Sequence, residues 1–90
     1  MARTITICGH VYSIIDSSTD IYGETKYDLQ TIAINPRLTE SMQQETLIHE
    51  IMHVALFHMN DHQQEDLEPM LNTIANTLYR MGFDPQINNG

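Results

Sequence analysis

The sequence predicts a single α+β domain over residues 1–90, with strands first and helices after them. Three observations predict this class. Residues 1–36 are rich in β-branched and aromatic types separated by turn formers, which is typical of a small sheet. Apolar residues then recur at helical spacing, first over 39–59 and again over 65–81. We therefore expect a small, mainly antiparallel sheet of three or four strands packed on a central helix, followed by a second helix.

The strand region is divided by two glycines. Residues 4–15 predict one bent strand or two short ones, because Gly9 interrupts a run of strand formers that includes Cys8. Gly23 is expected to be a second break, before further strand residues. Pro36 ends the last strand, since proline has no N–H to donate to a neighbouring strand.

The two helices differ in how their apolar residues are distributed. In 39–59 these residues surround nearly the whole circumference, which indicates a buried central helix, and Thr39 or Ser41 can cap its start. The second helix carries its apolar residues along one face, with Pro69 in the first turn. The members of that stripe are Leu67, Met70, Leu71, Ile74, Ala75 and Leu78.

The central helix contains the pattern HExxH, formed by His49, Glu50 and His53. The i, i+4 spacing puts both imidazoles on one face, where two nitrogens can converge on one zinc ion. Glu50 points to a different side of the helix, from which it can act as a general base on a water molecule without being a ligand. The pattern predicts a zinc-dependent hydrolytic site.

A catalytic zinc site needs a third protein ligand. Met59 stands where the extended metzincin pattern requires a histidine, which excludes that class. Among the acids near the second helix, Glu68 lies closest to the apolar stripe and is the favoured ligand, ahead of Asp66 and Glu65. His62 remains an alternative if the loop that contains it folds back.

Other polar side chains are weaker candidates. His58 is expected to be a helix-end residue, and His10 a strand residue facing solvent. Three tyrosines that could donate to an oxyanion are more typical of the edge of a core, namely Tyr22, Tyr27 and Tyr79.

Charge and composition exclude several classes of protein. Twelve acidic and four basic residues give a net charge of −8, which disfavours nucleic acid as a partner. A single cysteine cannot form an intramolecular disulfide, and no continuous apolar segment indicates a signal peptide or a membrane span. We expect a cytoplasmic protein whose thin core is stabilised by a metal.

The residues that carry the zinc motif resemble a known family. The strand-like segment 27–36, the segment 44–53 with its HExxH pattern, and Glu68 with the stripe after it are similar to the ImmA/IrrE-type small metallopeptidases of phages and mobile elements. The resemblance implies a minimal zincin-like core, with His49, His53 and Glu68 as zinc ligands and Glu50 as general base. It also implies a protein or peptide substrate, such as a repressor-type regulator.

Two functions follow from these patterns. The first is a zinc-dependent endopeptidase that acts on a protein. The alternative is a non-catalytic protein in which zinc only stabilises the fold, while the acidic surface binds a basic protein partner. The presence of Glu50, which a structural zinc site does not need, favours the enzyme.

Overall fold

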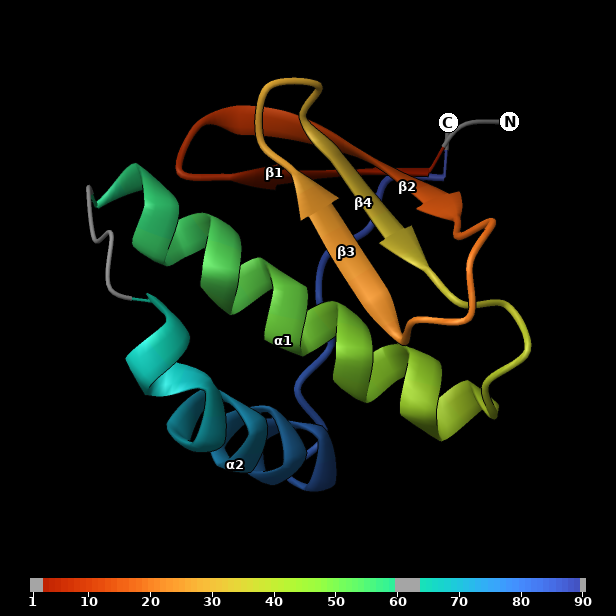
Figure 1. Ribbon diagram of the computed structural model, residues 1–90, viewed down its shortest axis with the longest axis vertical. Helices are drawn as coiled ribbons and strands as arrows, with labels where there is room; N and C mark the ends of the chain where they lie inside the picture. The colour runs from red at the N-terminus through yellow and green to blue at the C-terminus, as the bar shows by residue number, and fades with distance from the viewer. Residues whose placement is uncertain (1–2, 60–63, 90) are drawn as a thin grey trace.

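The computed structural model describes residues 3–59 and 64–89, which form four strands and two α-helices (Figure 1). The strands precede the helices, as predicted, and a short 3₁₀ turn over Gln64–Leu67 leads into the second helix. The elements are β1 (Arg3–Ile7), β2 (His10–Asp16), β3 (Gly23–Lys26), β4 (Thr31–Ile34), α1 (Glu40–His58) and α2 (Glu68–Arg80). This arrangement confirms the α+β class.

The four strands form one mixed sheet in the order β1-β2-β4-β3. β1 pairs with β2 and β3 pairs with β4 in antiparallel fashion, whereas β2 and β4 run parallel. After α2 the chain returns to β1, where the backbone groups of Thr4 and Asn88 exchange two hydrogen bonds of 2.8 Å. In the described part of the chain, the outer edge of β3 has no such partner strand.

The hairpin between β1 and β2 corrects the prediction for Cys8. Ile7 pairs with His10, so Cys8 and Gly9 form a two-residue loop. Both have positive φ, 51° and 81°, as the tight turn of a two-residue hairpin requires. Cys8 is therefore an exposed turn residue and not a strand residue.

Gly23 was expected to be a break, but it is the first residue of β3. The reason is steric, because β3 crosses directly over α1 at this point. A Cβ atom on Gly23 would lie 2.6 Å from Cγ2 of Thr46 on that helix, which is too close for any side chain. The glycine thus permits contact between strand and helix.

α1 lies between the sheet and α2, which explains why its sequence is apolar on most sides (Figure 1). Thr39 caps it, accepting a hydrogen bond from the backbone N–H of Met42, and this confirms one of the two predicted caps. Alternate residues of the strands face α1 and make the core with it. That core includes Ile5, Ile7, Tyr12, Ile14, Ile32, Ile34, Leu47 and Val54.

α2 begins at Glu68, three residues later than the start predicted at residue 65. Pro69 lies in its first turn, where a missing N–H leaves no hydrogen bond unmade, and the residues before it adopt the 3₁₀ turn instead. Leu71 and Ala75 are buried against α1, while Ile74 on the same stripe stays partly exposed. Neither α-helix in the described residues is long and apolar enough to cross a membrane.

Candidate metal centre

The two motif histidines point at one place on the surface of α1. One helical turn separates His49 from His53, and their Nε2 atoms lie 3.0 Å apart. Nδ1 of His49 is buried without a hydrogen-bond partner in the described residues. Nε2 is therefore the nitrogen through which this ring makes its polar contacts.

Glu68 closes this group from the second helix. As the first residue of α2, it directs its carboxylate across to α1, with Oε1 2.6 Å from Nε2 of His53 and Oε2 3.2 Å from Nε2 of His49. The three ligand atoms lie within 4.8 Å of one another. The structure thus brings together His49, His53 and Glu68, the three residues that the sequence analysis selected as ligands.

The donor set fits a zinc ion. Two imidazole nitrogens and one carboxylate oxygen are a known catalytic zinc set, and tetrahedral ligands at roughly 2.0–2.1 Å from a metal lie about 3.3 Å from each other. The two Nε2 atoms lie 3.0 Å apart, and each has one carboxylate oxygen of Glu68 within 3.2 Å, Oε1 for His53 and Oε2 for His49. A cation placed between the three side chains can bind both nitrogens and the carboxylate.

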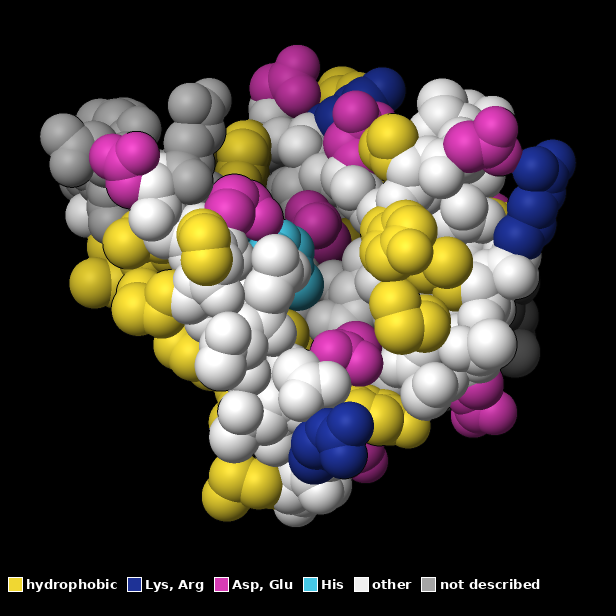
Figure 2. All heavy atoms as spheres, turned by 60° about the horizontal axis from the view of Figure 1, so that its bottom comes forward, with side chains coloured by type: hydrophobic (Ala, Val, Ile, Leu, Met, Phe, Trp, Pro, Cys, Tyr) yellow, Lys and Arg dark blue, Asp and Glu magenta, His cyan; other side chains and the backbone are white. Residues whose placement is uncertain are grey.

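The centre opens onto the surface. Figure 2 shows histidine side chains at the bottom of a hollow that is surrounded by Asp and Glu side chains. The part next to the three donors is also lined by β3 residues Gly23 and Thr25 and by Tyr27. A ligand or substrate can therefore approach the donor group from the side of the sheet edge.

Glu50 lies beside this group without belonging to it. It is among the few buried polar residues, with 7 % of its surface exposed, and it faces β3. Its Oε1 accepts a hydrogen bond of 2.7 Å from Oγ1 of Thr25. This hydroxyl fixes the orientation of the carboxylate next to the donor group and leaves Oε2 free of that contact.

Thr25 is a site residue that the sequence analysis missed. It belongs to a four-residue strand 25 positions before Glu50, and no local pattern connects the two. Only the crossing of β3 over α1 makes them neighbours. The one signal in the sequence for this contact is that a glycine, Gly23, is followed two positions later by a hydroxyl residue on the same face of the strand.

The tyrosines occupy three different places. Tyr22 lines a cavity next to His49, and Tyr27 lies at the mouth of the metal centre, where its ring stacks on Phe57 at 4.1 Å. Tyr79 lies on α2 away from the donors. Of the alternative ligands, His62 lies outside the described residues, as does the side chain of Glu65.

A second histidine cluster lies at the C-terminal end of α1. The ring of His58 stacks on that of His10 at 4.0 Å, and its Nε2 is 3.0 Å from the hydroxyl of Tyr12. Loss of solvent contact, and secondarily His10, lowers the pKa of His58 below 6.5. Burial, and secondarily Cys8, raises the pKa of Tyr12. His10 is exposed, as predicted, but it contributes a packing surface to this cluster.

Comparison with known proteins agrees with this geometry. Residues 12–78 match the peptidase family described as the IrrE N-terminal-like domain. No curated protein matches the chain, and no solved structure does. The matched segment extends from within β2 to the last turn of α2 and contains every residue of the donor group. The resemblance inferred from the sequence is confirmed, and the chain belongs to the IrrE N-terminal-like family of peptidases.

Proposed function

We propose that the chain is a zinc-dependent endopeptidase of the HExxH class that cleaves a protein substrate. The observation that carries this proposal is the combination of three convergent donors with a buried carboxylate, Glu50, that is not one of them. A zinc site that only stabilised the fold would need the donors but not that carboxylate. The family membership supports a peptidase but does not define the reaction at this level.

In the proposed mechanism the donor group holds zinc through His49, His53 and Glu68. When bound, zinc polarises the scissile carbonyl and lowers the pKa of a water molecule to about 7. Glu50 takes the proton from the attacking water at Oε2, because Oε1 is occupied by the hydroxyl of Thr25. The same carboxyl group then returns the proton to the nitrogen of the leaving amine.

The open edge of β3 is where we place the substrate backbone. An extended peptide can add to an unpaired strand edge through main-chain hydrogen bonds, as in many peptide-binding proteins. β3 is the outer strand on the side of the donor group, and its inward-facing residues Gly23 and Thr25 line that hollow. A peptide bound there would lie across the donors, and a repressor-type regulator is the first substrate to try.

The decisive experiment is the Glu50→Gln variant. Gln keeps the size of the side chain and its hydrogen bond with Thr25 but cannot take up a proton. We expect the zinc-loaded wild type to cleave members of a fluorescence-quenched peptide library, and the variant to retain one zinc per chain while losing activity about 100-fold or more. Elemental analysis and initial rates measure the two properties.

Glu40→Gln provides the matched control, since Glu40 is an exposed acid at the start of the same helix. It should change neither zinc content nor rate. A wild type that binds zinc but cleaves nothing, or a Glu50→Gln variant that is as active as the wild type, would contradict the proposed mechanism. The non-catalytic alternative predicts the first of these results.

A further inference from the structure

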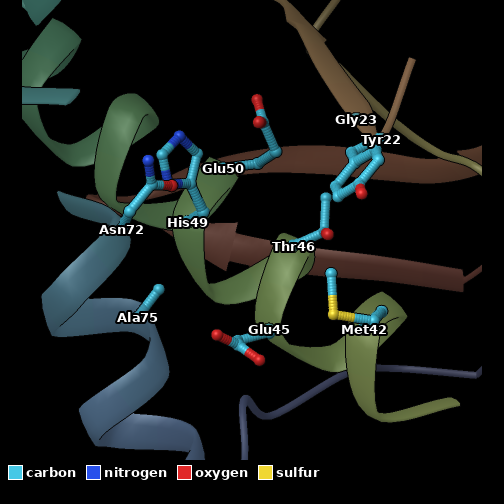
Figure 3. A pocket seen from close by; sticks show the side chains of 9 residues that line it. All are labelled: Tyr22, Gly23, Met42, Glu45, Thr46, His49, Glu50, Asn72 and Ala75. Atoms are coloured by element: carbon cyan, nitrogen blue, oxygen red, sulfur yellow. The ribbon is translucent and has the colours of Figure 1, made fainter. Parts of the chain in front are cut away.

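A cavity of about 330 Å³ lies next to the metal centre, between α1 and α2. His49 and Glu50 are at one end of it. Part of its wall is formed by Tyr22, from the loop before β3, and by Met42 of α1. Figure 3 shows the side chain of Glu45 at the end opposite to His49 and Glu50. We call this space the Glu45 cavity. It adjoins the place where the proposed chemistry occurs, because His49 and Glu50 line both.

The carboxylate of Glu45 is held in position by α2. Nδ2 of Asn76 donates a hydrogen bond of 2.8 Å to Oε1 of Glu45. Oδ1 of Asn76 in turn accepts a hydrogen bond of 3.1 Å from Nε of Arg80. The network fixes Oε1, while Oε2 receives no hydrogen bond from the described residues.

In the part of the chain that the structure describes, no cation pairs directly with the carboxylate of Glu45. Arg80 is the basic side chain nearest along this network, and it binds Asn76 instead of the carboxylate. Within residues 3–59 and 64–89, Glu45 forms no ion pair with Lys, Arg or His. A partly buried carboxylate in this setting favours a cationic ligand, and the net charge of −8 adds a long-range attraction for one.

The shape and lining of the cavity select the kind of cation. Between Glu45 and His49 the wall is formed by the small, uncharged side chains of Thr46 on α1 and Ala75 on α2, and Met42 adds an apolar surface beside Glu45. Glu45 precedes His49 by four residues, which corresponds to about 6 Å along the axis of α1. An apolar stem of that length with a positive tip describes the side chains of arginine and lysine.

We propose that the Glu45 cavity is a specificity subsite for an Arg or Lys side chain adjacent to the scissile bond, and that Glu45 is the residue that determines this preference. This proposal rests on the proposed function, because the cavity lies next to a scissile bond only if the chain is a peptidase. The binding preference for a basic side chain can be measured without any cleavage.

The first test measures binding alone. The full chain carrying Glu50→Gln is loaded with zinc and titrated with N-acetyl-arginine amide or N-acetyl-citrulline amide, which have nearly the same shape but differ in charge. We expect NMR shifts at residues lining the cavity and a roughly tenfold tighter binding of the arginine compound. Adding Glu45→Gln should bring the two affinities together, because Gln keeps the bond from Asn76 but has no charge.

Glu40→Gln in the same background serves as the control for net charge and should retain the preference. Equal affinities for the two compounds, shifts located elsewhere, or a preference that survives Glu45→Gln would each overturn the subsite. Failure of both compounds to shift the cavity residues at their solubility limit would do the same.

The second test uses cleavage by the zinc-loaded wild type of matched peptides that contain arginine or citrulline at a single position beside the cleaved bond. We expect kcat/KM to be about tenfold higher for the arginine peptide, and this ratio to fall to about one in Glu45→Gln. Cleavage without preference overturns the subsite and keeps the proposed function. A binding preference without any cleavage keeps the subsite and removes the proposed function.

Discussion

α1 carries two histidine clusters that are chemically similar and structurally different. His49 and His53 point their Nε2 atoms at one position, and Glu68 supplies a carboxylate there. His58, five residues further on, stacks its ring face to face on His10, with planes only 3° apart. In the first cluster the lone pairs of the ligand atoms point at one position, whereas in the second cluster the imidazole rings stack face to face.

The difference shows that the partner of a histidine decides what the histidine can do. A carboxylate opposite two imidazoles makes a site for a cation. A phenol hydroxyl at 3.0 Å and a second imidazole in parallel stacking make a packing contact between β2 and the end of α1. We therefore expect metal-dependent properties to follow the first cluster, and an effect of pH without metal to follow the second.

The largest expected effect is on zinc affinity. Glu68→Ala removes one of three protein ligands. Loss of a residue that only hydrogen-bonds to a metal ligand typically weakens metal affinity about 10–100-fold, so we expect loss of a ligand itself to weaken zinc affinity about 100-fold or more. Asp66→Ala is the matched control, because Asp66 is an exposed acid just before α2. Competitive zinc titration measures both. Equal affinities for the two variants would move the third ligand elsewhere, with His62 and Glu65 as the next residues to change.

Removing zinc with a chelator should lower the Tm only when the first histidine cluster is intact. Zinc at 100 times its Kd stabilises a folded chain by about 2.7 kcal/mol, which corresponds to a Tm change of about 10–20 °C for a domain of this size. We expect this drop in Tm when a chelator is added to the zinc-loaded wild type and to His58→Gln. His49→Ala should show almost none. A drop of the same size in His49→Ala would mean that the metal stabilises the fold from another place.

The smallest expected effect concerns pH. Because the pKa of folded His58 is lowered from 6.5, the unfolded chain binds more protons below that pH, and the free energy of unfolding should fall as the pH falls. The contribution is fully present above about pH 6.5. His58→Gln should flatten this part of the profile when both proteins are measured by urea unfolding with chelator present. Parallel profiles for the two proteins would assign the pH dependence to other groups.

Much of the fold could be predicted because its determinants are local. Alternation of apolar residues, the turn formers around Gly9, and the cap at Thr39 all act within a few residues. The sheet is mainly antiparallel, as expected, but the parallel pairing of β2 with β4 depends on contacts between distant segments and was not predicted. The start of α2 at Glu68 also depended on how the preceding turn packs, which no periodicity reveals.

The candidate site divides in the same way. His49 and His53 are placed by the geometry of one helix, and the side of α2 on which Glu68 lies follows from its apolar stripe. Thr25 and Asn76 could not be predicted, because each reaches its carboxylate from another element, over 25 and 31 residues of chain. These hydrogen bonds exist only once β3 and α2 are packed on α1.

The contact between Gly23 and Thr46 has a consequence for the width of the groove. The strand has no side chain of its own at position 23 and rests there on the short, branched side chain of Thr46, so this contact leaves little room for the separation of β3 from Glu50 to change. A single methyl group at position 23 would clash with Thr46 and push β3 away from α1, which would move Thr25 away from Glu50. Glu24 and Lys26, which are exposed on the same strand, can be replaced without altering this dimension. Directed changes in this strand are therefore best introduced at those outward positions, with residue 23 left untouched.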